Sequence, residues 1–134
     1  MRERKMNAPG LTAYTQTNID SIVHEATPHK LIEMLFKGAK DALAQAMGAI
    51  EQKDFEAKGK KISKATEIIL NLQTYLDKEK GGEVAENLNE LYTYMAKVLI
   101  DANRTNDLEK LREILGLLDT VANGWASMSE EFKR

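Results

Sequence analysis

Residues 27–50, TPHKLIEMLFKGAKDALAQAMGAI, decide the fold of this 134-residue chain. Thr27 is a good helix N-cap, and Pro28 suits the first helical position, where a backbone N–H would have no helical partner. Apolar residues then recur at spacings of three and four, which places them on one face of a helix. The main stripe is Leu31, Leu35, Ala39, Ala42 and Ala46, widened by Ile32, Leu43 and Ile50. The pattern predicts an amphipathic helix from Pro28 to about Gln52.

Two more helices follow, separated by a pair of glycines. Asp54 is a typical N-cap, so a second helix is expected over residues 55–76. Gly81 and Gly82 mark the connection after it, because glycine tolerates the positive φ with which helices end. A third helix is expected over residues 83–102. The main stripes are Ile62, Ala65, Ile69, Leu72 and Leu76 in the second helix, and Val84, Leu88, Leu91, Met95, Leu99 and Ala102 in the third.

A fourth helix completes the predicted fold. Asn106 with Glu109 three residues later resembles a capping box and opens a helix that extends to about Met128. Its main stripe is Leu108, Leu111, Leu115, Leu118, Ala122 and Trp125. Four helices of roughly 20 residues with short loops favour an up-down-up-down arrangement. The predicted fold class is therefore all-α, an antiparallel four-helix bundle with a short N-terminal helical segment.

The chain is expected to form one domain, because its length suits a single core. Residues 27–128 form the bundle, and residues 1–12 and 129–134 are expected to be flexible tails. Residues 13–24 make a short segment with a few apolar side chains in a polar stretch: Tyr14, Ile19, Ile22 and Val23. A helix this short does not stand alone, since nucleation is unfavourable. The segment therefore either docks on the bundle as a lid or stays disordered.

Composition narrows the classes of function. The net charge is −2, with 19 basic and 21 acidic residues interleaved, so no basic face for nucleic acid or for an anionic membrane is expected. There is no cysteine, which excludes disulfides, thiolate nucleophiles and cysteine-based zinc sites. No apolar run has the length of a membrane span, and the N-terminus does not read as a secretory signal. A cytosolic location is expected.

No catalytic or metal-binding pattern is found. The histidines are His24 and His29, and neither lies three residues after a glutamate, as di-metal bundles require. A phosphorelay bundle that uses His29 is an alternative, disfavoured because His29 lies in a first turn and is expected to be solvated. Lysines of the second helix, Lys58, Lys60, Lys61 and Lys64, are expected to form another solvated face. No cofactor, metal or enzyme activity is predicted.

Three of the helices carry apolar residues beyond their main stripes. These are Ile114, Leu117, Val121 and Met128 on the fourth helix, Tyr94 and Val98 on the third, and Ile68 and Tyr75 on the second. A four-helix bundle needs only one apolar stripe per helix to form its core. A second apolar stripe is therefore expected to be covered by something else. Two interpretations stay open: a skewed bundle with a broader core, or a groove for a partner helix.

Several separated motifs resemble those of the flagellar secretion chaperone family FliS. Residues 76–88, LDKEKGGEVAENL, are similar to its Leu-Asp, Lys-Gly-Gly and Asn-Leu pattern, and residues 91–95, LYTYM, to the continuation of that pattern. Residues 26–36, ATPHKLIEMLF, resemble the opening of its first long helix. Ala13-Tyr14, Ala102-Asn103 and Trp125 also fall where the family has them. The motifs occur in the right order over nearly the whole chain.

The resemblance implies a cytosolic chaperone that binds the disordered C-terminal segment of flagellin. Such binding prevents premature polymerisation and aids delivery to the flagellar type III export apparatus. The export gate and other export or regulatory proteins are further candidate partners, and the chain itself is expected as a monomer or homodimer. A self-associating structural or adaptor bundle is the alternative function.

In the family the N-terminal segment often covers part of the flagellin site, which implies a lid role for Tyr14, Ile19, Ile22 and Val23. We predict that flagellin contacts the additional stripes of the bundle. The expected main contacts are Ile114, Leu117 and Val121, and the secondary contacts are Tyr94, Val98, Ile68 and Tyr75.

Overall fold

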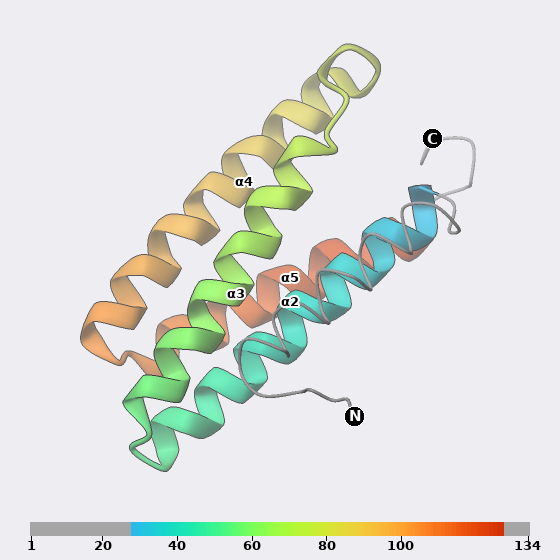
Figure 1. The fold of residues 1–134 in the computed structure, drawn as a ribbon. Helices are drawn as coiled ribbons and strands as arrows, with labels where there is room; N and C mark the ends of the chain where they lie inside the picture. Colours follow the sequence, from blue (N-terminus) through green and yellow to red (C-terminus); the bar gives the residue numbers. More distant parts are fainter. Residues whose placement is uncertain (1–27, 128–134) are drawn as a thin grey trace.

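The computed structural model describes residues 28–127, and residues 1–27 and 128–134 lie outside the described part. The described part consists of four helices (Figure 1). They are α2 (Pro28–Glu51), α3 (Phe55–Thr74), α4 (Lys78–Thr105) and α5 (Leu108–Ser127). The predicted lid segment, both predicted tails and Met128 fall outside it.

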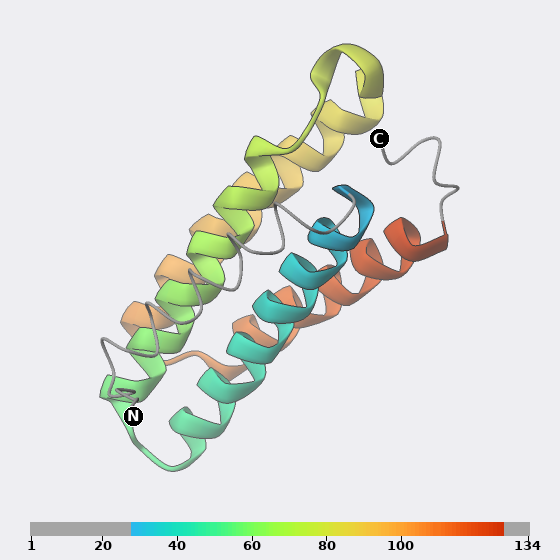
Figure 2. The ribbon, with the colours of Figure 1, turned by 45° about the vertical axis from the view of Figure 1, so that its right-hand side comes forward.

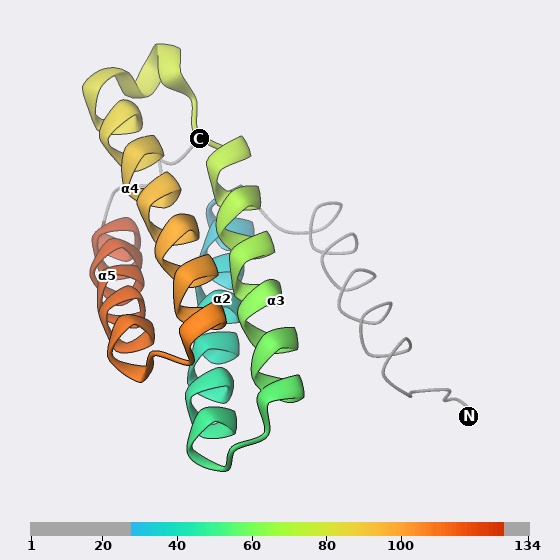
Figure 3. The same cartoon turned by 90° about the vertical axis from the view of Figure 1, so that its left-hand side faces the viewer.

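The four helices form an antiparallel bundle, as the sequence predicts. α2 packs against α3 and α5, and α4 packs against the same two helices, so each has two neighbours. Successive helices alternate in direction (Figure 3). The α3–α4 pair and the α2–α5 pair diverge toward the end of the bundle where α2 begins and α5 ends (Figure 2). The candidate site lies at this divergent end of the bundle.

Aspartate side chains cap α3 and α5 at their N-termini. The predicted cap Asp54 is confirmed, since its Oδ1 accepts a hydrogen bond from the backbone N–H of Ala57 at 3.2 Å. The predicted cap of α5 is wrong by one residue. Asp107 accepts from the Lys110 N–H at 3.2 Å, whereas Asn106 has a φ of +53°. Asn106 adopts the left-handed conformation that ends α4. Asparagine tolerates this conformation better than most residues do.

The glycine pair lies inside the first turns of α4 rather than before it. One turn forms at residues 78–81, where the N–H of Glu79 is bonded to Asp77 Oδ1 at 3.1 Å. Gly82 then breaks the helix with φ +52° and ψ −127°. Close packing also requires the first glycine, because a Cβ on Gly81 would lie 2.7 Å from the Cβ of Ala85. The sequence located the break correctly but missed the short turn that precedes it.

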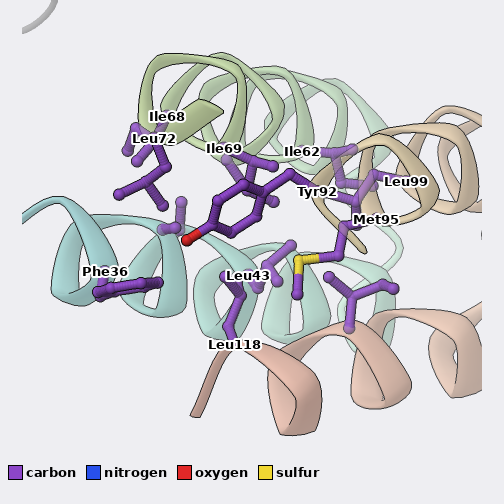
Figure 4. Packing of buried hydrophobic residues seen from close by; sticks show 14 of the residues in the cluster. Phe36, Leu43, Ile62, Ile68, Ile69, Leu72, Tyr92, Met95, Leu99 and Leu118 are labelled. Carbon is purple, nitrogen blue, oxygen red and sulfur yellow. The ribbon is translucent and has the colours of Figure 1, made fainter. Parts of the chain in front are cut away.

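The core lies along the bundle axis and is formed by all four helices. Its largest fully buried side chains are Leu43, Ile62, Ile69, Leu72, Met95, Leu99, Leu111, Ile114 and Leu118, most of which appear in Figure 4. The main stripe of α2 is buried as predicted. Tyr92, which no predicted stripe contains, is also buried, and its ring projects among side chains of α2 and α3 (Figure 4).

Two residues that were predicted to lie in the core, Leu115 and Val84, are less buried than expected. On α5, Ile114 is fully buried, while Leu115 is only partly buried at the edge of the core. The two stripes of that helix lie side by side, and the helix is rotated toward the one expected to be spare. On α4, Val84 is 64% exposed instead of buried, because it follows the break at Gly82 at the divergent end of the bundle.

Lys58 is not part of a solvated face. Its side chain is buried, and its ammonium group donates to the carbonyl oxygen of Asn103 at 2.7 Å and to Asn103 Oδ1 at 2.8 Å. The same group lies 5.9 Å from the centre of the Phe55 ring. A cation at the last turn of a helix satisfies free carbonyls and complements the helix dipole. Lys58 therefore ties the start of α3 to the end of α4.

Candidate functional site

An apolar pocket of about 300 Å³ opens at the divergent end of the bundle. All four helices contribute to it: the first turns of α2, the end of α3, the start of α4 and the last turns of α5. Its lining is Ile32, Phe36, Leu72, Tyr75, Leu76, Val84, Leu88, Tyr92, Val121, Gly124 and Trp125. We call this the apolar pocket.

The lining of the apolar pocket suits hydrocarbon groups. It contains aliphatic and aromatic side chains and no ionisable group except the phenols of Tyr75 and Tyr92. Burial raises the pKa of Tyr92 to about 12, so this phenol stays neutral at ordinary pH. Tyr75 and Val84 are exposed at the rim. A pocket of this kind binds apolar side chains that reach it from outside.

Apolar side chains continue from the pocket along the contact between α4 and α5. The hydroxyl of Tyr94 donates to Glu113 Oε2 at 2.5 Å, and Lys110 is paired with Asp101, which sets how the two antiparallel helices are aligned. One turn from Tyr94 and Glu113 toward the pocket, this alignment places Leu91 opposite Leu117. One turn further, Leu88 and Val121 both line the pocket. We call this row the α4–α5 seam: Leu88, Leu91, Val98, Leu117 and Val121, all partly buried.

Polar groups mark the far end of the α4–α5 seam. Lys110 and Arg104 both pair with Asp101, and their hydrogen bonds lower the pKa of that carboxyl group. The hydrogen bond to Glu113 raises the pKa of Tyr94. The seam therefore has an apolar end at the pocket and a charged end at Asp101.

The structure divides the seven predicted contact residues into three groups. Tyr75 and Val121 line the apolar pocket; Leu117, Val98 and Tyr94 lie along the contact between α4 and α5; Ile68 and Ile114 are in the core. The placement of Ile68 and Ile114 on a surface stripe is wrong. Ile68 is directed toward α2, where its Cδ1 lies 3.4 Å from the position that a Cβ on Gly38 would take.

Most of the pocket lining was missed by the sequence patterns. Phe36 and Tyr92 belonged to no predicted stripe, while Val84, Leu88 and Trp125 were assigned to the core. Tyr92 and Trp125 do lie at positions where the chain resembles the FliS family. That resemblance was the available signal for these two aromatic residues, because helical periodicity alone does not distinguish a pocket wall from a core.

His29 lies at the edge of the apolar pocket and is not a solvated residue. Its side chain is 14% exposed, and its Nε2 lies 2.6 Å from Glu33 Oε1. Its ring stacks obliquely against Trp125, with the centroids 5.6 Å apart. The indole N–H of Trp125 donates to the backbone carbonyl of His29 at 3.3 Å. An enclosed imidazole paired in this way is poorly placed to accept a phosphoryl group from another protein.

The described part of the chain shows neither a metal site nor a membrane-spanning helix. Within residues 28–127, no group of three or more histidine, aspartate or glutamate side chains is arranged to hold a metal ion. Within the same residues, no helix is long and apolar enough to cross a membrane. The apolar pocket, with its exposed rim, and the adjoining α4–α5 seam form the candidate site.

Comparison with known proteins identifies the family. The sequence model described as "Flagellar protein FliS" matches residues 10–131. The chain belongs to the FliS family. The flagellar secretion chaperone FliS of Salmonella typhimurium is 50% identical over 123 residues, which cover 91% of both chains. FliSB of Pseudomonas aeruginosa, also a flagellar secretion chaperone, is 45% identical over 87% of this chain and 92% of its own.

A more distant relative belongs to the same family. The flagellar secretion chaperone FliS of Vibrio cholerae is 34% identical over 91% of this chain and 90% of its own. FliS proteins are chaperones rather than enzymes, and membership of this family supports a flagellar export chaperone. The resemblance seen in the sequence motifs is thus confirmed.

Proposed function

We propose that this chain is a cytosolic export chaperone that binds the C-terminal segment of flagellin. Binding prevents premature polymerisation and aids delivery to the flagellar type III export apparatus. Membership of the FliS family supports the chaperone role. The binding surface is proposed on one observation, the open apolar pocket with its exposed rim residues Tyr75 and Val84.

The shape of the candidate site suits a segment that orders only on binding. Such a segment loses conformational entropy when it orders, so it needs apolar anchors that compensate for that loss. The apolar pocket provides one anchor site, and the α4–α5 seam continues from it with Leu91 and Leu117. An amphipathic helix lying in a groove uses anchors at successive turns in this way. The segment is thereby kept from other copies of flagellin.

The proposal includes the N-terminal lid. Residues 13–24 lie outside the described part, but the described chain starts at Pro28, and Ile32 and Phe36 in the first turns of α2 line the apolar pocket. The N-terminal end of α2 therefore lies beside the proposed site. In this proposal, Tyr14, Ile19, Ile22 and Val23 compete with flagellin for the pocket.

The proposed binding surface is tested by a charge placed on the rim of the pocket. Val84→Asp introduces a carboxylate against the apolar partner, which is unfavourable unless the charge is paired. Val84 is 64% exposed, so we expect the bundle to stay folded. Calorimetric titration with a flagellin C-terminal peptide is expected to show an affinity at least about tenfold weaker, or ~1.4 kcal/mol.

Ile100→Asp is the matched control. Ile100 is a β-branched residue of the same helix with 65% exposure, and it does not line the apolar pocket. We expect this variant to bind the peptide as the wild type does. Equal losses in both variants, or no loss in Val84→Asp, would place the binding surface elsewhere. Light scattering adds a check, since a dimer that persists unchanged with peptide would favour the self-associating bundle.

A further inference from the structure

We infer that His29 is a positioning residue for the apolar pocket: its ring holds Trp125 in place as part of the pocket wall. This inference rests on the proposed function, since it concerns the same pocket. His29 does not line the pocket, and any effect on a bound partner is transmitted through Trp125.

Two contacts connect the first turns of α2 to the last turns of α5, and a third holds the His29 ring from within α2. The indole N–H of Trp125 donates to the His29 carbonyl oxygen at 3.3 Å, and the two rings pack with centroids 5.6 Å apart at an angle of 35°. Glu33, one turn along α2, holds the imidazole through its Nε2 at 2.6 Å. The ring of His29 is thus fixed from one side and supports the indole on the other.

The position of Trp125 explains why such support matters. Trp125 lies in the last described turn of α5 (Leu108–Ser127), and its side chain is only partly buried. No basic side chain in that turn is available to compensate the helix dipole. Gly124 and Val121 line the same wall, so displacement of Trp125 would disturb one complete side of the pocket.

A pocket wall whose side chains are already held in place favours binding, because fewer side chains lose conformational freedom when the partner binds. A binding site that is already in its bound shape avoids the entropy loss of immobilising large side chains. An aromatic pair of this kind contributes enough to change an affinity by about two- to tenfold. Without the ring of His29, the indole would have more freedom in the unbound protein.

Trp125 is the only tryptophan of the chain, so its fluorescence reports on the wall directly. We would compare the full-length wild type with His29→Ala, and measure acrylamide quenching and peptide affinity in both. We expect quenching to rise about twofold and the affinity for the flagellin C-terminal peptide to fall about threefold, as for loss of an aromatic contact. His29→Phe keeps a ring at this position and is expected to restore both values toward those of the wild type.

Asp119→Asn is the matched control. Lys40 and Asp119 form another polar contact between α2 and α5, at 3.2 Å, and neither residue lines the apolar pocket. Quenching and affinity are expected to stay unchanged in this variant. Glu33→Ala provides a second test, because it keeps the ring but removes the group that fixes it; we expect a smaller change in the same direction.

Several outcomes would overturn the inference. Unchanged quenching in folded His29→Ala, no restoration by His29→Phe, or an equal effect of Asp119→Asn would each show that the ring does not position Trp125. If His29→Ala does not fold, unchanged quenching in Glu33→Ala has the same meaning. Failure of the wild type to bind the peptide would instead refute the proposed function, while the quenching comparison would still decide the role of His29.

Discussion

The buried ammonium group of Lys58 is expected to be a major contributor to the stability of the bundle. Lys58→Met keeps most of the apolar stem of the side chain but removes both hydrogen bonds to Asn103, at 2.7 and 2.8 Å. Hydrogen bonds that involve a charged group each contribute about 1.5–3 kcal/mol. Part of this is recovered, because the side-chain oxygen of Asn103 can turn toward water. We therefore expect the free energy of unfolding to fall by about 2–4 kcal/mol.

Urea denaturation followed by far-UV circular dichroism measures this loss. Lys60→Met serves as the control, because Lys60 is an exposed lysine of the same helix. An exposed substitution of this type changes stability by no more than about 0.5 kcal/mol. A loss below about 1 kcal/mol in Lys58→Met would show that water replaces the ammonium group easily. Lys58 would then be a partly solvated lysine, as the sequence pattern suggested.

Two further predictions concern the pocket and the break in α4. Burial raises the pKa of Tyr92 to about 12, so the folded protein holds the phenolic proton more tightly than the unfolded chain does. The resulting stabilisation of about 2–3 kcal/mol is complete below pH ~10 and is lost as the pH rises to ~12. Urea melts across that pH range measure this loss, and the contribution of Tyr92 to it should be absent in Tyr92→Phe. Gly82→Ala is expected to destabilise by about 1–3 kcal/mol, because residue 82 has a φ of +52°. Gly48→Ala is the control: nothing lies within 4 Å of the added Cβ, so it should stabilise α2 by roughly 0.5–1 kcal/mol. Similar melting curves for the two glycine variants would contradict the view that Gly82 is needed for the break in α4.

The fold could be predicted from the sequence because its signals are local. Capping by Asp54 and the helical spacing of apolar residues act within one or two turns, and both appear in the structure. The errors come from competition between neighbouring residues. Asn106 and Asp107 are both good caps, but only one can be the N-cap of α5, and the end of α4 requires Asn106 in a left-handed conformation. Neither helix alone contains that information.

The candidate site could be predicted only in part, because it depends on how the helices are rotated and how they diverge. α5 carries two adjacent apolar stripes, and periodicity cannot determine which one faces the axis. The structure buries Ile114 and leaves Leu115, Leu117 and Val121 partly buried at the edge of the core. Burial of Lys58 was missed for a related reason: its partner Asn103 lies 45 residues further along the chain.

The apolar pocket follows from an uneven distribution of side-chain size along α2. Toward its C-terminal half the buried face is formed mainly by alanines, Ala39, Ala42 and Ala46, which allow neighbouring helices to approach closely. In its first turns the same face carries the larger side chains of Leu31, Leu35 and Phe36. Helices that are close at one end and held apart at the other must diverge, as α2–α5 and α3–α4 do (Figure 2). The divergent end leaves apolar side chains of all four helices only partly covered, and that is the surface a partner segment would complete.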